Sequence, residues 1–125
     1  MKKIVQTSNA PNPVGAYSQA VRAGKFVFVS GQVGIDPKQG KITANNIIAQ
    51  TNRALENIKA ILEAEAYTLS DVVQSNVFLS SIELFSEFNR EYSKFFPNEP
   101  PARVTVGAML GLGALVEISV IAYKE

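Results

Sequence analysis

Apolar residues recur along this chain with two periods, one typical of helices and the other typical of strands. Between residues 47 and 62 they return every three or four positions, with polar side chains on the other side. This spacing predicts an amphipathic helix of about five turns, and Thr43 stands where it can cap the start of that helix. The residues of the apolar stripe are Ile47, Ile48, Thr51, Leu55, Ile58, Ile61 and Leu62.

A second helix is predicted by aromatic residues at helical spacing. The segment Ser80–Glu83 before them has the serine-to-glutamate spacing of a capping box. Pro97 ends the helix, because proline has no N–H with which to continue the hydrogen-bond ladder. The aromatic residues are Phe85, Phe88, Tyr92, Phe95 and Phe96.

Much of the remaining chain has the β-branched and apolar composition of strands. The element order β-β-β-α-β-α-β-β predicts one α+β domain over residues 1–125, with about six strands and two helices on one face of the sheet. The predicted strands are Ile4–Val5, Tyr17–Val21, residues 26–33, Val72–Leu79, residues 102–109 and Leu115–Tyr123. Turns are predicted at Ala23–Lys25, Asp36–Gly40 and Gly111–Gly113.

Two helices can cover only one face of a sheet of this size. Residues Phe26–Val29 are nevertheless apolar on both faces, and Leu115–Ile121 nearly so. Because a large exposed apolar patch marks an interaction site, we expect an oligomer whose subunits close sheet face against sheet face. A strongly curled sheet that buries itself within a monomer is the alternative that this pattern leaves open.

The composition restricts the available chemistry. The chain contains neither Cys nor His, which excludes thiolate chemistry, Ser-His and Cys-His nucleophile systems and the usual zinc ligand sets. A Mg²⁺ or Ca²⁺ site made only of carboxylates stays formally possible, but Asp36 and Asp71 are the only aspartates and no Asp-rich loop exists. We therefore expect neither a metal nor a cofactor.

The charge distribution and the hydropathy of the chain indicate which partners and which cellular location to expect. The 12 basic and 11 acidic residues give a net charge of +1 and are scattered, with Lys2–Lys3 as the only basic pair. The pattern therefore does not favour nucleic acid, whose binding proteins usually carry a basic patch. No signal-peptide apolar region follows the first residues, and no window approaches the roughly 18 apolar residues of a membrane span. The expected location is the cytoplasm.

Two charged residues are the strongest candidates for a site. Arg103 follows Pro100-Pro101-Ala102, which fixes its approach, and a guanidinium held there can bind a carboxylate through two parallel hydrogen bonds. Glu117 lies between Val116 and Ile118, and a carboxylate in such a strand is either paired or functional. The alternatives are a surface ion pair for Arg103 and a structural ion pair at a subunit seam for Glu117.

Three further features are weaker candidates. Ser30-Gly31-Gln32 places a glycine inside a strand, which indicates either a ligand close to the backbone, bound by the Gly31 N–H, or a bulge. Tyr17 follows a proline-rich loop and is a candidate lid, although such a residue more often only packs. Asn89 is a polar residue of the second helix, and its polarity alone does not indicate a functional role.

Several segments, in order along nearly the whole chain, form a specific set. They are Asn12-Pro-Val-Gly-Ala-Tyr-Ser-Gln-Ala20, Phe28-Val-Ser-Gly-Gln32, Gln50-Thr51, Ala54-Leu-Glu-Asn-Ile58, Phe88-Asn89, Tyr92, Phe95-Phe96, Pro101-Ala-Arg103 and Ala114-Leu-Val-Glu-Ile118. With these segments the chain resembles the reactive-intermediate (imine/enamine) deaminases, the Rid or YjgF family. The resemblance implies a chorismate-mutase-like fold with a mixed sheet, and a homotrimer with clefts between its subunits.

The resemblance also implies an activity without a cofactor. The reaction is hydrolysis of 2-iminobutanoate and 2-iminopropanoate, or of the enamines that tautomerise to them, to 2-keto acids and ammonia. Pyridoxal-phosphate-dependent dehydratases of amino-acid metabolism, including isoleucine biosynthesis, release these intermediates. The implied roles are carboxylate binding by Arg103 and the Gly31 N–H, water activation by Glu117, closure by Tyr17, and shaping of the cleft by Ser30 and Asn89.

The chain departs from the usual family pattern at three positions. Thr105 stands where many members carry a Cys that the implied mechanism does not require, and its backbone carbonyl remains available. Gly111 replaces a proline and predicts a looser turn, while Ala66 replaces a glycine and predicts a different C-cap. These changes leave the substrate preference open. The alternative functions are a non-catalytic keto-acid-binding regulator and, less favoured, an RNA-directed translation inhibitor or endoribonuclease, or a holdase-like chaperone.

Overall fold

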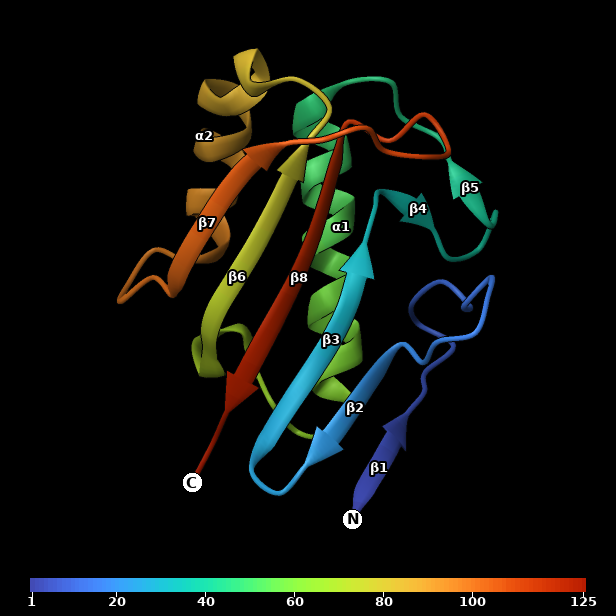
Figure 1. The fold of residues 1–125 in the computed structure, drawn as a ribbon, viewed down its shortest axis with the longest axis vertical. Coiled ribbons are helices and arrows are strands. Elements are labelled where there is room, and N and C mark those ends of the chain that lie inside the picture. Colours follow the sequence, from blue (N-terminus) through green and yellow to red (C-terminus); the bar gives the residue numbers. More distant parts are fainter.

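The computed structural model describes residues 1–125 and confirms an α+β fold built on one mixed six-stranded sheet. The strands lie in the order β1-β2-β3-β8-β6-β7, in which β6 and β7 are parallel and the other neighbours are antiparallel (Figure 1). The last strand therefore lies inside the sheet. The bounds are β1 (Lys2–Val5), β2 (Ala20–Ala23), β3 (Phe26–Gln32), β6 (Val72–Leu79), β7 (Ala102–Gly107) and β8 (Val116–Tyr123).

The two α-helices, α1 (Ile47–Glu63) and α2 (Phe85–Phe95), lie on one face of the sheet, behind the strands in Figure 1. α1 packs against β3, β8 and α2, and its Leu55, Ile58 and Ile61 side chains are completely buried. Each such side chain stabilises the fold by about 1.5–3 kcal/mol. None of the helices is long and apolar enough to cross a membrane.

Both helices begin at different residues from those predicted. The N-cap of α1 is Asn46, whose side chain accepts the Ala49 N–H at 2.8 Å, and the prediction of Thr43 is wrong because Thr43 lies too far before the first helical turn. Before α2, Ser81 rather than Ser80 accepts an N–H, that of Glu83 at 3.3 Å. A short 3₁₀ helix, η2 (Ile82–Leu84), then leads into α2.

Some strand limits also differ from the prediction. β2 begins at Ala20 instead of Tyr17, and β7 ends at Gly107 instead of residue 109. The predicted turn at Asp36–Gly40 joins two short strands that the pattern did not indicate, β4 (Ile35–Asp36) and β5 (Lys41–Ile42). A 3₁₀ helix, η1 (Leu69–Asp71), precedes β6.

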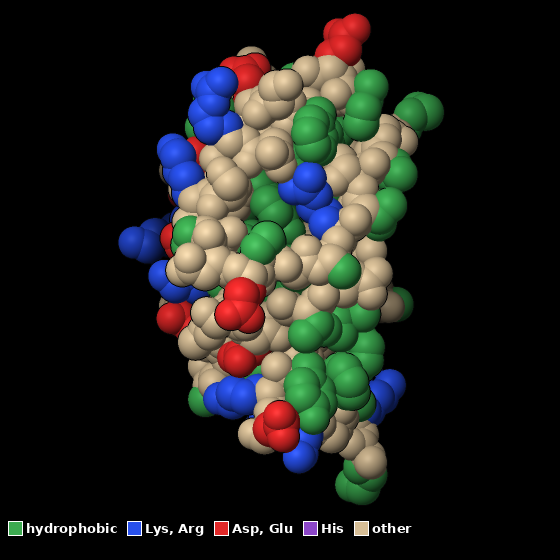
Figure 2. All heavy atoms as spheres, turned by 90° about the vertical axis from the view of Figure 1, so that its left-hand side faces the viewer, with side chains coloured by type: hydrophobic (Ala, Val, Ile, Leu, Met, Phe, Trp, Pro, Cys, Tyr) green, Lys and Arg blue, Asp and Glu red, His purple; other side chains and the backbone are tan.

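The sheet face opposite the helices carries apolar side chains that nothing in the chain covers. Phe26 and Phe28 on β3, and Val104 and Val106 on β7, are exposed by 41% to 50%. Figure 2 views the molecule from its β7 side and shows hydrophobic side chains along one edge, with most charged groups along the opposite edge. The sheet therefore does not curl enough to bury this surface, which we call the open face.

Ala66 adopts the left-handed backbone conformation that usually requires glycine, with φ of 61°. The N–H of Tyr67 donates to Leu62 and the N–H of Ala66 donates to Glu63, both at 3.0 Å. These two bonds form a Schellman motif, the usual glycine C-cap. The prediction of a different C-cap is therefore wrong, because the backbone keeps the glycine geometry and an alanine tolerates it.

We expect Ala66→Gly to raise the free energy of unfolding by about 0.5–1 kcal/mol, because glycine removes the steric cost of a Cβ at positive φ. The matched control is Ala64→Gly, at an exposed position with φ of −60°, which should lower it by a similar amount. Urea denaturation of both variants measures the difference. A loss of stability in both variants would contradict the argument.

Candidate functional site

Glu117 lies on β8 beside a bulge in β3 that contains Gly31. Val29 pairs with Val120 and Gln32 pairs with Ile118, so β3 has one residue more than β8 over this stretch, which defines a β-bulge. A Cβ on Gly31 would come within 2.9 Å of the Glu117 Cδ atom and would overlap the carboxylate. Glycine is therefore required for the Glu117 side chain to lie against the β3 backbone.

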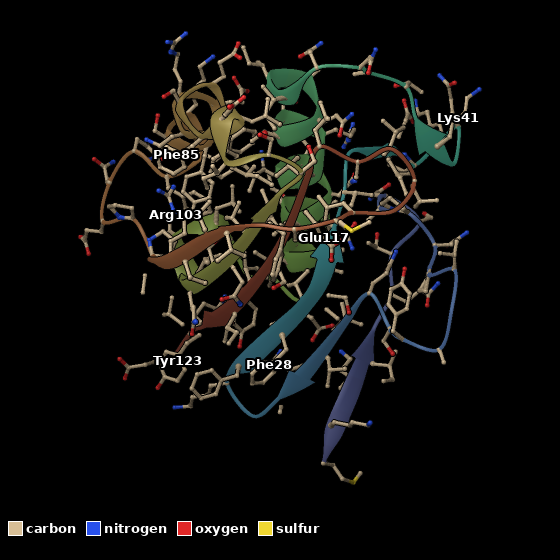
Figure 3. All side chains as sticks on the ribbon, turned by 45° about the horizontal axis from the view of Figure 1, so that its top comes forward. Phe28, Lys41, Phe85, Arg103, Glu117 and Tyr123 are labelled. Carbon is tan, nitrogen blue, oxygen red and sulfur yellow. The ribbon has the colours of Figure 1, made fainter.

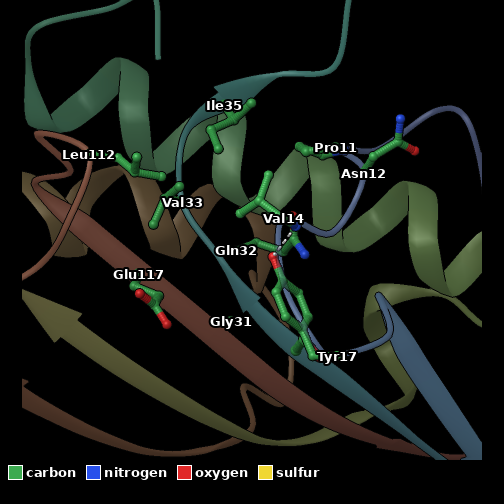
Figure 4. Close-up of a pocket in the computed structure, with 11 residues that line it drawn as sticks. Pro11, Asn12, Val14, Tyr17, Gly31, Gln32, Val33, Ile35, Leu112 and Glu117 are labelled. Carbon is green, nitrogen blue, oxygen red and sulfur yellow. Dashed lines mark hydrogen bonds between the residues drawn. The ribbon is translucent and has the colours of Figure 1, made fainter. Parts of the chain in front are cut away.

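A pocket of about 390 Å³, which we call the Glu117 pocket, opens at this bulge (Figure 4). Glu117, Gly31 and Tyr17 lie towards one end, and apolar side chains lie towards the other (Figure 4). Glu117 is the only charged residue among those that line it. The lining residues are Pro11, Asn12, Val14, Tyr17, Ser30, Gly31, Gln32, Val33, Ile35, Leu112 and Glu117.

The proline-rich loop that forms one wall of the Glu117 pocket is held by Gln19, a residue that sequence reasoning did not single out. Gln19 is buried, and its amide nitrogen donates to the carbonyls of Thr7, Ala10 and Pro11 at 3.0, 3.3 and 2.8 Å. Its amide oxygen accepts the Thr7 N–H at 2.8 Å. A polar residue directly before a buried strand, which must find partners when buried, was the available signal.

Two predicted site residues also organise this wall. The Tyr17 hydroxyl accepts the Val14 N–H at 3.4 Å, so the ring closes its own loop. The Ser30 hydroxyl donates to the Ser18 carbonyl at 2.6 Å and ties the bulge to the end of that loop. Both residues shape the Glu117 pocket through contacts within the chain.

Arg103 lies on β7, where its guanidinium rests against α2 (Figure 3). Its Nη1 atom donates to the Asn89 side-chain oxygen at 2.8 Å, and its Cζ atom lies 4.8 to 5.7 Å from the ring centres of Phe85, Phe88 and Tyr92. Such cation–π contacts hold a guanidinium without neutralising it. A second pocket, the Arg103 pocket, opens here between α2 and Pro101.

Neither candidate charge is paired within the chain. Its ion pairs join Lys3 and Arg22 to Glu65, and Lys94 to Glu91. The surface ion pair considered for Arg103 is therefore not present. The chain also has no group of three His, Cys, Asp or Glu side chains that could hold a metal ion.

Three buried hydroxyl groups near Arg103 have no hydrogen-bond partner of suitable geometry. They belong to Ser75, Tyr92 and Thr105. Burial raises the pKa of the Tyr92 hydroxyl, and the neighbouring Ser75 hydroxyl and Arg103 guanidinium oppose that shift. Because buried polar groups normally have partners, this cluster is suited to receive a polar ligand or an ordered water beside the guanidinium.

One chain does not bring Arg103 and Glu117 together. Arg103 is in register with the buried Ser75, whereas Glu117 is in register with Phe78, three residues further along β6. Since side chains alternate along a strand, the two residues point to opposite faces of the sheet (Figure 3). Tyr17, Ser30 and Gly31 line the Glu117 pocket, while Asn89 lines the Arg103 pocket.

The mixed sheet with two helices on one face belongs to the chorismate-mutase-like class of folds. A family model described as Endoribonuclease L-PSP matches residues 7–124. The chain belongs to this family, which is also called the Rid, YjgF or RutC family. The resemblance inferred from the ordered sequence segments is therefore confirmed.

Individual relatives match along nearly their whole length. A RutC family protein of Saccharolobus solfataricus is 52% identical, with 100% of both chains covered. A 2-iminobutanoate/2-iminopropanoate deaminase of Dermatophagoides farinae is 39% identical over 99% of this chain and 98% of its own.

Solved structures agree with the fold. A crystal structure from Thermotoga maritima has a TM-score of 0.96 and 45% identity, covering 100% of this chain and 99% of that one. The structure of E. coli TdcF with bound serine has a TM-score of 0.93 and 34% identity, and the match covers 98% of this chain and 99% of that one.

We expect Gly31→Ala to displace the Glu117 carboxylate and to lower the free energy of unfolding by about 0.5–1.5 kcal/mol, because the new Cβ overlaps the end of a flexible side chain that must change its rotamer. Gly111→Ala is the matched control, since its Cβ would meet no atom within 4 Å. The double variant Gly31→Ala/Glu117→Ala should recover much of the loss, because it removes the overlap. Urea denaturation of wild type, Gly31→Ala, Glu117→Ala and the double variant completes a double-mutant cycle that measures the coupling, and strictly additive effects would contradict this geometry.

Proposed function

We propose that this protein hydrolyses 2-imino acids such as 2-iminobutanoate and 2-iminopropanoate, and their enamine tautomers, to 2-keto acids and ammonia. The observation that carries the proposal is Arg103, an unpaired guanidinium held rigidly at the edge of the sheet by Asn89 and three aromatic rings. The relative named as a deaminase for these two imines, matched over nearly the whole chain, supports the activity. TdcF with bound serine supports a small carboxylate-bearing ligand.

Arg103 would bind the substrate carboxylate. Its one hydrogen bond within the chain uses Nη1, which leaves its other N–H groups for the planar, two-bond recognition of a carboxylate. The buried hydroxyls of Tyr92 and Thr105 would supply further polar contacts on this side. A substrate anchored in this way presents its imine carbon in a fixed orientation, which lowers the entropic cost of the reaction.

Glu117 would act on the water. A protonated imine is already electrophilic, so the enzyme needs no nucleophile of its own. Glu117 would accept a proton as the water oxygen bonds to the imine carbon, and would give it to the nitrogen of the resulting carbinolamine. As the C–N bond breaks and ammonia leaves, the C=O bond of the keto acid forms and Glu117 takes up the hydroxyl proton, which it then releases to ammonia or solvent. The absence of a side chain at Gly31 lets the Glu117 carboxylate lie close to the β3 backbone, and the Gly31 N–H is the proposed second donor to the substrate carboxylate.

This mechanism requires more than one copy of the chain, because Arg103 and Glu117 point to opposite faces of one sheet. We place the active sites between the subunits of a homotrimer, where Arg103 of one subunit approaches Glu117 of the next. The open face supports this assembly, because its apolar side chains would be buried by neighbouring copies.

Two other functions explain the candidate site less well than imine hydrolysis does. A regulator that binds keto acids without turnover would need Arg103 but no group that activates water, and it leaves Glu117 unexplained. An endoribonuclease, which the family model's description names, would be expected to bind RNA through a basic patch. Here the basic and acidic side chains are intermixed (Figure 2) and the net charge is only +1.

The direct test measures ammonia released from 2-aminoacrylate and 2-aminocrotonate that a dehydratase generates in the same cuvette. Wild type should accelerate release above the spontaneous rate, and Arg103→Ala should lose at least about a hundredfold in kcat/KM, the loss expected for removing a fixed charge-assisted contact. Circular dichroism of the variant confirms that it is folded. No acceleration by wild type would reject the enzyme and favour the keto-acid-binding alternative.

Mixing two inactive variants tests the shared site. Arg103→Ala and Glu117→Gln should each be inactive alone, and trimers refolded from an equal mixture should regain about a quarter of the sites, because some neighbours then combine both native residues. A site contained within one chain predicts no recovery. Refolded unmixed variants serve as the control.

A further inference from the structure

The apolar end of the Glu117 pocket has no role in the chemistry proposed above. Carboxylate binding requires Arg103 and water activation requires Glu117, whereas Val33, Ile35 and Leu112 offer only apolar contacts. Figure 4 shows these three side chains grouped at the end of the pocket away from Tyr17. The volume of the whole pocket, about 390 Å³, falls within the roughly 300–1,000 Å³ of small-molecule sites, so the pocket is large enough to hold a small ligand that reaches these side chains.

Leu112 occupies an unfavourable position in two respects. Its backbone has φ of 63°, a conformation that Cβ sterics disfavour for every residue except glycine. Its side chain is 71% exposed although it is entirely apolar. An exposed, strained residue at the rim of a pocket indicates a functional role more than a folding role, because a glycine or a polar residue would suit this turn better.

Val14 stands on a different segment of the same rim and is 82% exposed. Its position is defined, since its N–H donates to the Tyr17 hydroxyl and Gln19 fastens the loop behind it. Two separate segments therefore hold exposed apolar side chains over one pocket. Within one chain its lining contains no basic residue, and its single charge is the Glu117 carboxylate. An acidic substrate side chain would therefore meet repulsion, because Arg103 of the neighbouring subunit is already engaged by the substrate carboxylate in the proposed site.

We propose that this end of the pocket receives the side chain of the substrate, and that the protein prefers imino acids with aliphatic side chains longer than ethyl, such as the imine of leucine. The inference rests on the proposed function and names its substrate class. Leu112 and Val14 are then specificity-determining residues, which contact the side chain of the imino acid and not its reacting atoms. The preference arises from apolar area that the longer side chain removes from water.

The test compares kcat/KM for imines that an amino-acid oxidase makes from alanine, leucine and glutamate, with catalase present. Wild type should hydrolyse the leucine imine about tenfold more efficiently than the alanine imine, and the glutamate imine should be the poorest. Leu112→Gly, which suits the positive φ, and Val14→Ser should each lower the leucine-to-alanine ratio by about tenfold. The control Met109→Ser removes a fully exposed apolar residue of the same loop that does not line the pocket, and should keep the ratio.

Binding of the products separates this inference from the proposed function, because it needs no turnover. Titration calorimetry should show tighter binding of 4-methyl-2-oxopentanoate than of pyruvate, and Leu112→Gly should remove the difference. Equal affinities in wild type would overturn the inference even if imines are hydrolysed. A preference for the longer keto acid without any hydrolysis would support the pocket assignment and reject the deaminase.

The oligomeric state completes the test. Sedimentation of Leu112→Gly should match that of wild type. If the variant dissociates, and its kcat/KM falls equally for the leucine and alanine imines, Leu112 belongs to a subunit contact. That result would overturn its role in specificity.

Discussion

The structure depends on a mismatch between its layers, because two helices cover one face of a six-stranded sheet and nothing in the chain covers the other. On the helix side, alternate residues of β3, β6 and β8 form a continuous core with α1 and α2. On the open face, β3 and β7 expose aromatic and β-branched side chains where a solvated sheet would be polar. The same alternation sends Arg103 to one face and Glu117 to the other. The proposed trimer would cover the open face with neighbouring copies, and it would bring Arg103 of one copy to Glu117 of the next.

Each candidate residue is held by a different physical device. Arg103 rests on aromatic rings and an amide, which position a guanidinium while leaving its charge available. Glu117 lies so close to the bulge in β3 that any side chain at position 31 would overlap its carboxylate. The loop opposite it depends on the buried amide of Gln19, which satisfies four backbone groups. None of these devices needs a metal, a thiol or an imidazole, which is consistent with a composition that lacks Cys and His.

The departures from the usual family pattern have different structural consequences. Ala66 keeps a glycine conformation at some cost, so this change concerns stability. Thr105, two residues beyond Arg103 on β7, leaves a buried hydroxyl without a hydrogen-bond partner. The turn that contains Gly111 places Leu112 over the Glu117 pocket. The last two changes lie on the segments next to Arg103 and Glu117, and neither replaces one of these two residues.

The sequence by itself determined the fold class, both helices, most strands and the family, because these depend on local periodicity and on an ordered set of segments. It also indicated Arg103, Glu117 and Gly31, whose residue types are unusual in apolar strands. Tertiary structure alone decided that Gln19 fastens the loop and that Asn46 rather than Thr43 caps α1. It also decided that the two charged residues lie in separate pockets. Strand register and the sheet face of each side chain are set by pairing between distant segments, which periodicity along one segment does not encode.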